Sequence, residues 1–239
     1  MLENVNIENI LFIDVETVPV CSKYEELSDA FKELWNKKAV RIAKNENDTP
    51  KIIYNKAGIY AEFGKIICIS AGIVKKQSGK NILRIKSFSG HDEKIILADF
   101  IELLKKHFNK SENLLCAHNG KEFDFPYIAR RILINDLKIP NILDISGKKP
   151  WEINHLDTME LWKFGDYKNY TSLALLTAVF NIPTPKDDID GSMVADVYWK
   201  ENNLQRIVDY CQKDVAAIVQ IFLKYKGEEI IEPENIIVS

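Results

Sequence analysis

The sequence has 239 residues, of which 46% are apolar and 28% are charged, and its formal net charge is −3. A chain of this size can bury one substantial core, so we expect a single domain over 1–239. The small negative charge excludes a broad basic coat, and any contact with nucleic acid must therefore be local. No run of about eighteen apolar residues and no basic N-terminal flank occurs, so we expect neither a membrane span nor a signal peptide. The four cysteines are isolated and form no C-x-x-C pair, so we expect reduced core residues in a cytoplasmic protein.

The first predicted element is a buried strand at 9–16, an apolar run rich in branched residues that carboxylates interrupt only at its end. Apolar residues at helical spacing between Tyr24 and Trp35 then predict a helix, and the polar stretch 44–50 predicts a loop. We therefore expect a helical insertion at about 23–60, between the first two strands.

The rest of the chain is predicted to contain both strands and helices. Strands at 64–74 and 81–89 are separated by Lys-Lys-Gln-Ser-Gly-Lys, which is typical of a hairpin. Further strands are predicted at 113–117 and around 153–156. Helices are predicted at 92–108, about 123–135, 171–180, 192–200 and 204–226. Strands first and interleaved helices later indicate an α/β domain with a mixed sheet.

Two carboxylates, Asp14 and Glu16, stand at the end of the first predicted strand. Because side chains alternate along a strand, residues two apart point to the same face. Burying two like charges together is costly unless a cation joins them, and oxygen ligands suit hard cations such as Mg²⁺ or Mn²⁺. The pair also fits a strand end that simply emerges into solvent.

The last predicted helix carries Tyr210 and Asp214, which are four apart and therefore share one helical face. Asp214 lies close to the apolar stripe of this helix, where a carboxylate needs a partner. A tyrosine packed in the core beside a solvated aspartate fits the same spacing.

Midway between these motifs, Asn119 and Gly120 form a predicted turn that leads into a helix beginning around Asp124. An aspartate at a helix start is most often a cap, and capping is the local interpretation of Asp124. Asp157 and Glu160, three apart, likewise fit helix capping better than a metal site.

The order of the three motifs, D-x-E, N-x-x-x-F-D and Y-x-x-x-D, resembles that of the DEDD exonuclease superfamily. The chain resembles the exonuclease domain of family B DNA polymerases, and more closely the stand-alone bacterial group described as predicted 3′→5′ exonucleases related to that domain. The resemblance runs from Ile10 to about Tyr225 and includes the stretch 185–192. The superfamily's histidine variant has His five residues before the final aspartate; here that residue is Asp209, so the tyrosine class, DEDDy, is the match.

The resemblance implies a ribonuclease H-like fold with a five-stranded mixed sheet flanked by helices, and a site for two Mg²⁺ or Mn²⁺ ions. It implies that Asp14, Glu16 and Asp214 hold the ion that activates water. Asp14 would bridge to a second ion, which Asp124 supports, and Tyr210 would orient the attacking water.

On the substrate side, the resemblance implies that Thr17 and Phe123 lie near the terminal nucleotide, with Phe123 stacking on a base. Asn119 would contact substrate or steady the site. The expected partner is a nucleic acid with a free 3′ end, single-stranded DNA in our leading interpretation. The alternatives are an RNA-trimming enzyme resembling ribonuclease D, a catalytically silent nucleic-acid-binding module, and an endonuclease of the same broader fold.

Overall fold

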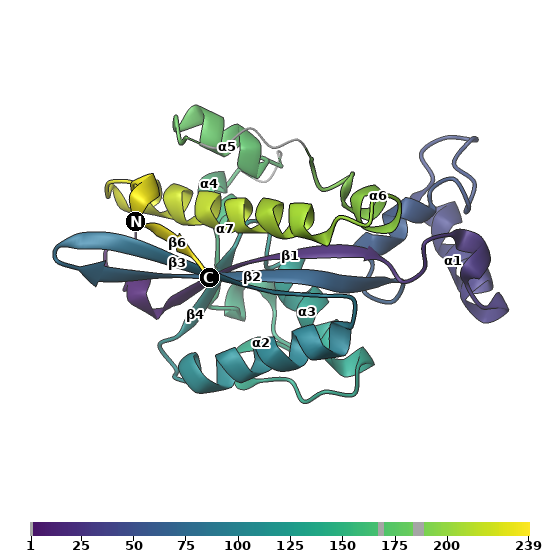
Figure 1. The fold of residues 1–239 in the computed structure, drawn as a ribbon, viewed down its shortest axis with the longest axis horizontal. Coiled ribbons are helices and arrows are strands. Elements are labelled where there is room, and N and C mark those ends of the chain that lie inside the picture. Colours follow the sequence, from purple (N-terminus) through teal and green to yellow (C-terminus); the bar gives the residue numbers. More distant parts are fainter. Residues whose placement is uncertain (1, 167–169, 184–188) are drawn as a thin grey trace.

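The computed structural model describes residues 2–166, 170–183 and 189–239, and its centre is one sheet with helices on both faces (Figure 1). In the described ranges the sheet has six strands in the order β5-β4-β1-β2-β3-β6. Their bounds are β1 Ile10–Pro19, β2 Gly64–Gln77, β3 Lys80–Ser89, β4 Leu114–Ala117, β5 Leu156–Asp157 and β6 Ile236–Val238.

The sheet is mixed, as the sequence predicted. β1, β2 and β3 are antiparallel to their neighbours in the meander, whereas β4 runs parallel to β1, β5 parallel to β4, and β6 parallel to β3. The prediction of five strands was one too few. The missed strand β6 has only three residues, and its pairing with β3 at the sheet edge is a long-range contact that a three-residue pattern does not reveal.

Helices form a layer on each face of the sheet (Figure 1). One layer contains α2 and α3, and the other contains α7 with α4, α5 and α6 around it. Their bounds are α2 Glu93–His107, α3 Asp124–Ile134, α4 Thr158–Lys163, α5 Leu173–Val179, α6 Val194–Trp199 and α7 Leu204–Lys226. The short helix α4 was not predicted. None of the helices in these described ranges is both long and apolar enough to span a membrane.

The alternation along β1 determines which layer each side chain meets. Leu11, Ile13 and Val15 are buried in the core that includes α2 and α3. Ile10 and Phe12 belong to the core beneath α7, where the rings of Phe12 and Phe222 lie 5.4 Å apart. Residues 14 and 16 continue this second series, so their side chains point toward α7.

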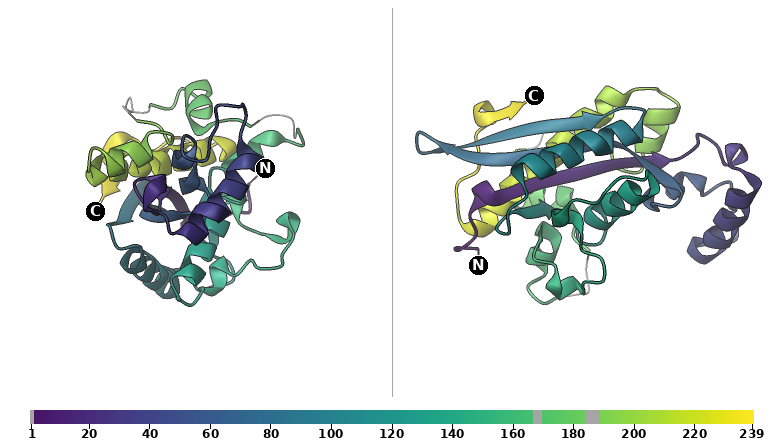
Figure 2. Two further views of the ribbon diagram at one scale, coloured as in Figure 1. Left: turned by 90° about the vertical axis from the view of Figure 1, so that its right-hand side faces the viewer. Right: turned by 90° about the horizontal axis from the view of Figure 1, so that it is seen from below.

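The segment predicted as an insertion contains α1 (Asp29–Ile42), which lies beyond the end of the sheet (Figure 2). α1 begins later than the pattern from Tyr24 predicted, because Ser28 caps it by accepting a hydrogen bond from the N–H of Phe31. The segment has its own small core around the fully buried Trp35, whose indole N–H donates to the carbonyl of Pro50 at 2.8 Å.

The hairpin between β2 and β3 is tighter than predicted, because both strands extend to a two-residue turn at Ser78 and Gly79. Both residues have positive φ, 51° and 80°, as a type I′ turn requires. The first four residues of the stretch 185–192, to which the sequence resemblance pointed, lie outside the described residues.

Candidate active site

The candidate site lies where the α7 face of β1 meets α7. Asp14 and Glu16 pair with Ser70 and Cys68 of β2, and the register shifts by one residue directly after Glu16. Such bulges bend a strand and re-aim its side chains, and they are frequent beside active sites. The predicted common direction of the two carboxylates is confirmed, because their oxygens lie within 4.8 Å of each other.

Cys211 of α7 completes this group, since its sulfur also lies within 4.8 Å of the two carboxylates. The thiol donates a hydrogen bond to the backbone carbonyl of Asp14 at 3.5 Å, and burial raises the pKa of Cys211 well above its usual value. The thiol therefore stays protonated and is a poor ligand, which leaves the carboxylates as the donor set. The prediction that Cys211 is a reduced core residue is confirmed.

The two carboxylates are held in an environment that disfavours negative charge. Glu16 is 8% exposed, and its pKa is raised well above normal by burial and by the charges of Asp14 and Asp214. Burial likewise raises the pKa of Asp14 to about 6, against a smaller opposing effect of hydrogen bonds from Cys211 and the backbone of Val15. Glu16 does not emerge into solvent at a strand end, so that interpretation of the pair is wrong.

The chemistry of this donor set fits a hard divalent cation. Asp14 Oδ2 is buried and has no hydrogen-bond partner among the described residues. A buried polar atom without a partner costs on the order of 1–3 kcal/mol, unless something absent from the protein itself satisfies it. A cation such as Mg²⁺ or Mn²⁺ would satisfy this oxygen and relieve the repulsion among the carboxylates.

Asp124 reaches the group from the opposite layer, as the first residue of α3. The N-cap position is occupied by Phe123, which makes no capping bond with its side chain, so the interpretation of Asp124 as the helix cap is wrong. Asp124 is 4% exposed, and burial together with the charge of Asp14 raises its pKa well above normal. Backbone hydrogen bonds from Asp124 itself and from Val15 of β1 oppose this shift and tie the two elements together.

The turn that delivers Asp124 is fixed by Asp157. Its carboxylate accepts hydrogen bonds from the backbone N–H groups of Asn119 at 3.0 Å and Lys121 at 3.1 Å. The same side chain caps α4 by accepting from Met159 and Glu160, which confirms the predicted capping role. The sequence did not reveal the second role, since it depends on β5 lying beside β4.

Two residues of this turn, Asn119 and Gly120, are suited to their positions, the first by its backbone conformation and the second by its lack of a side chain. Asn119 has φ of 64°, a left-handed conformation that asparagine tolerates better than most residues. Its side-chain Oδ1 is buried and, among the described residues, has no partner. At Gly120 a Cβ atom would collide with Ala117 and lie 3.0 Å from the ring of Phe125, so a side chain does not fit.

Tyr210 agrees in part with both interpretations that the sequence left open, because its ring packs in the core while its hydroxyl lies beside the carboxylates. It is half-buried and packs against an apolar cluster that includes Val18 and Ile67. Its hydroxyl nevertheless faces the carboxylates: burial, then the charges of Asp214 and Glu16, raise the pKa of Tyr210, and a hydrogen bond with Asp214 contributes. The phenol is thus protonated and sits at the edge of the acidic group.

A cleft of about 560 Å³ opens beside Glu16. Thr17 and Phe123 line it, so two of the three residues expected near substrate lie together, while Asn119 is not among the described residues of its wall. The cleft is also lined by the 23–60 segment, by the residues just before α6 and by the first turn of α6, with residues Asn55, Lys56, Gly58, Ile59, Gly191, Ser192 and Ala195. No local pattern in the sequence pointed to Lys56, because its position depends on how the insertion packs.

The insertion is held against the sheet at Gly58. Its carbonyl accepts a hydrogen bond from the hydroxyl of Tyr127 in α3 at 2.7 Å. A Cβ atom at Gly58 would lie 3.1–3.2 Å from the backbone of Val18 and Pro19, so the two chains approach each other closely. The wall of the cleft is therefore fixed to β1 at Val18, two residues beyond Glu16.

With this geometry established, comparison with known proteins gives a family. Residues 59–230 match the family described as "Predicted 3'-5' exonuclease related to the exonuclease domain of PolB". This chain belongs to that family. The matched segment contains Asp124, Tyr210 and Asp214, while Asp14 and Glu16 precede it.

The fold is also similar to a solved structure, that of the family B DNA polymerase from the hyperthermophilic archaeon Pyrobaculum calidifontis. The TM-score is 0.51 at 13% sequence identity, over 90% of this chain and 24% of the polymerase. The chain thus spans about a quarter of that protein's length. The ribonuclease H-like fold expected from the motif order is confirmed, with six strands in place of five.

Proposed function

We propose that this protein is a metal-dependent 3′→5′ exonuclease of the DEDDy type, which releases nucleotides from DNA ends by phosphodiester hydrolysis. The observation that carries the proposal is the carboxylate pair of Asp14 and Glu16, whose oxygens lie within 4.8 Å of each other and in which Asp14 Oδ2 has no partner among the described residues. The charges of Asp214 and Asp124 also act on Glu16 and help to raise its pKa. Family membership supports the reaction class, since the family is described as predicted 3′→5′ exonucleases.

We assign the metal ligands to Asp14, Glu16, Asp124 and Asp214, which would hold two Mg²⁺ or Mn²⁺ ions. When bound, such ions lower the pKa of a ligated water and stabilise the charge that develops on the phosphoryl oxygens. The protein's own contribution is to keep four carboxylates close together in spite of their repulsion, which the packing of β1 against α7 supports.

Tyr210 has the role of orienting the attacking water. Its raised pKa keeps the phenolic proton in place, so the hydroxyl can donate to one oxygen while accepting from the water. Thr17 and Phe123 would position the terminal nucleotide in the 560 Å³ cleft, with the ring of Phe123 against the base. Asn119, whose Oδ1 has no partner among the described residues, would steady that nucleotide or the ligands.

DNA is the proposed substrate because the family is related to the exonuclease domain of PolB. A single strand with a free 3′ end suits a cleft whose walls stand close to Glu16. We further propose that 1–239 acts as one exonuclease domain in which the 23–60 insertion forms a substrate wall. The free state of all four cysteines is in keeping with a cytoplasmic location.

The test is hydrolysis of 5′-labelled DNA and RNA oligonucleotides in the presence of Mg²⁺ or Mn²⁺. We expect DNA to shorten one nucleotide at a time from the 3′ end, and Asp14→Asn to reduce the rate by at least about 10³-fold. The matched control is Asp99→Asn, an exposed carboxylate on α2, which should retain the wild-type rate.

Each of the other possible results would contradict a different part of the proposed function. If only the RNA oligonucleotide is shortened, the substrate is RNA and not DNA. Cutting of a closed circular DNA would indicate an endonuclease. If neither substrate is cut and Asp14→Asn behaves as wild type, the proposed activity is wrong.

A further inference from the structure

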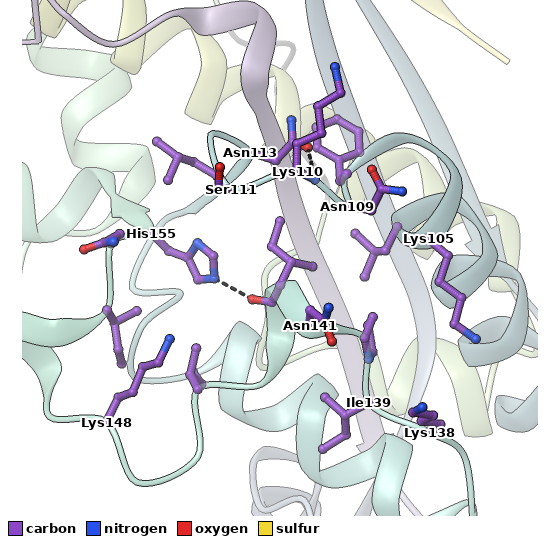
Figure 3. Close-up of a pocket in the computed structure, with 18 residues that line it drawn as sticks. Lys105, Asn109, Lys110, Ser111, Asn113, Lys138, Ile139, Asn141, Lys148 and His155 are labelled. Carbon is purple, nitrogen blue, oxygen red and sulfur yellow. Dashed lines mark hydrogen bonds between the residues drawn. The ribbon is translucent and has the colours of Figure 1, made fainter.

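A second cleft, of about 640 Å³, is shown in Figure 3. Its lining includes residues 138–142, which follow the C-terminal end of α3, whereas Asp124 is at the other end of that helix. The cleft is bounded by the C-terminal end of α2, the start of β4, the turn that follows α3, and the segment leading to β5. α3 has 11 residues, so at a rise of 1.5 Å per residue its two ends are roughly 16 Å apart. The cleft is therefore separate from the candidate active site.

The charge of this cleft is of one sign. Four lysines line it, and none of its described lining residues is an aspartate or a glutamate. The lysines come from four different segments and stand on different sides of the opening (Figure 3); they are Lys105, Lys110, Lys138 and Lys148. All four are exposed, and none forms an ion pair with a described carboxylate.

The fold itself accounts for only one of these lysines. Lys105 lies in the last turn of α2, where a cation is favoured by the helix dipole, and it also lowers the pKa of Glu102 on the same helix. Lys110, Lys138 and Lys148 lie in connecting segments with no such benefit. In a chain whose net charge is −3, three further cations directed at one cleft point to an anionic ligand.

The floor of the cleft is neutral and rigid. His155 accepts a hydrogen bond at Nδ1 from the N–H of Leu115 at 3.2 Å and donates from Nε2 to the carbonyl of Ile142 at 2.7 Å. Burial lowers the pKa of His155, and the charge of Lys148 lowers it further, so the ring stays uncharged at neutral pH. Around it stand neutral amide and hydroxyl groups able to hydrogen-bond a ligand, namely Asn109, Ser111, Asn113, Asn141 and Asn154.

We propose that this lysine cleft binds the phosphate backbone of a single-stranded nucleic acid, at a distance from the strand end held in the active site. Several separated cations suit a chain of phosphates better than one small anion, and apolar side chains between them, such as Ile139 and Ile142, offer contact area for sugars or bases. The choice of a nucleic acid as the ligand of this cleft rests on the proposed function.

The test is binding of a 5′-fluorescein oligodeoxythymidylate of 20 nucleotides, followed by anisotropy in EDTA so that hydrolysis does not interfere. The variant is Lys138→Ala/Lys148→Ala. The matched control is Lys75→Ala/Lys80→Ala, which removes the same charge from exposed positions on the β2–β3 hairpin.

We expect the cleft variant to bind the 20-mer more weakly than wild type does, and the control variant to bind it as wild type does. Each lost phosphate contact on a single strand reduces the slope of log K against log salt by about 0.7, so two lost contacts reduce it by about 1.4. If affinities are equal at 1 M salt, this slope amounts to about 60-fold at 50 mM and about 10-fold at 200 mM.

Two results would overturn the proposal. One is equal 20-mer binding by the cleft and control variants. The other is binding of a fluorescein-labelled heptaglutamate peptide by wild type that does not bind the oligonucleotide. The outcome is independent of catalysis. If wild type hydrolyses DNA while the cleft variant binds normally, only the cleft is wrong. If the cleft binds DNA that wild type and Asp14→Asn both leave intact, only the proposed activity is wrong.

Discussion

Replacing Asp14 by asparagine should stabilise the metal-free protein at neutral pH, because the carboxylate cluster is then under electrostatic stress. The pKa of Asp14 is raised from 3.8 to about 6 in the folded state, so folding favours its protonated form. The stability associated with this proton is fully present below about pH 4 and is lost as the pH rises through about 6. A difference of about 2 pKa units corresponds to about 3 kcal/mol at pH 7.5.

Asparagine does not ionise, so the variant avoids this loss. For a chain of this length each kcal/mol shifts Tm by about 2–4 °C, and the variant should melt about 6–12 °C above wild type at pH 7.5 in EDTA. Near pH 4 the two should melt together. Acid-labile contacts elsewhere, such as the buried ion pair of Glu93 and Arg131, are common to both proteins and cancel in the difference.

The assay is thermal unfolding followed by circular dichroism at pH 4.5, 6.0 and 7.5, with Asp99→Asn as the control for loss of an exposed carboxylate. Added Mn²⁺ at 100 times its Kd should stabilise wild type by about 2.7 kcal/mol at pH 7.5, with a smaller gain at pH 5 where protons compete. Asp14→Asn should lose most of this gain. A difference between variant and wild type that does not grow with pH, or an equal Mn²⁺ effect in both, would refute the reasoning.

Three further outcomes follow from the site and its walls. Lys56→Ala should raise KM for DNA about three- to tenfold with kcat within twofold, because Lys56 lines the cleft and is not one of the proposed metal ligands. Lys51→Ala in the same insertion, which removes an ion pair with Glu25, should change neither constant in the same kinetic assay. Tyr210→Phe should lower kcat about 10- to 100-fold in single-turnover hydrolysis while leaving the Mn²⁺-dependent rise in Tm intact, which a merely structural role would not. Gly64→Ala should cost about 1–3 kcal/mol in urea unfolding, since its methyl group would collide with the hydroxyl of Tyr127.

The parts of the site that the sequence predicted are those with a local cause. Asp14 and Glu16 share a face because strands alternate, and their burial follows from the same apolar run that predicts β1. Tyr210 and Asp214 share a face because they are four apart on α7. That these two pairs of residues lie close together was inferred from the order of the motifs. Neither the strand periodicity nor the helix periodicity indicates that β1 packs against α7.

The parts that local sequence patterns did not reveal depend on distant packing. Asp124 looks locally like a cap, but its burial comes from β1, which supplies a backbone hydrogen bond at Val15. The double role of Asp157 requires β5 to lie beside β4, and the exposure of Lys56 in the cleft requires the insertion to dock through Gly58. In each case the residue type is ordinary, and only its neighbours make it informative.

Average charge is a poor guide to the partners of this protein, because its charges are separated along α3. The helix begins at Asp124, among carboxylates whose raised pKa values express their mutual repulsion, and it ends near Lys138, beside a cleft lined by lysines. Without ions the first end repels a phosphate chain and only the second attracts it. Bound divalent cations would reverse the sign at the first end and make both ends of α3 attractive to one strand. On the proposed function, metal therefore both supplies the chemistry and admits the substrate, so nucleic-acid affinity and metal affinity should rise together.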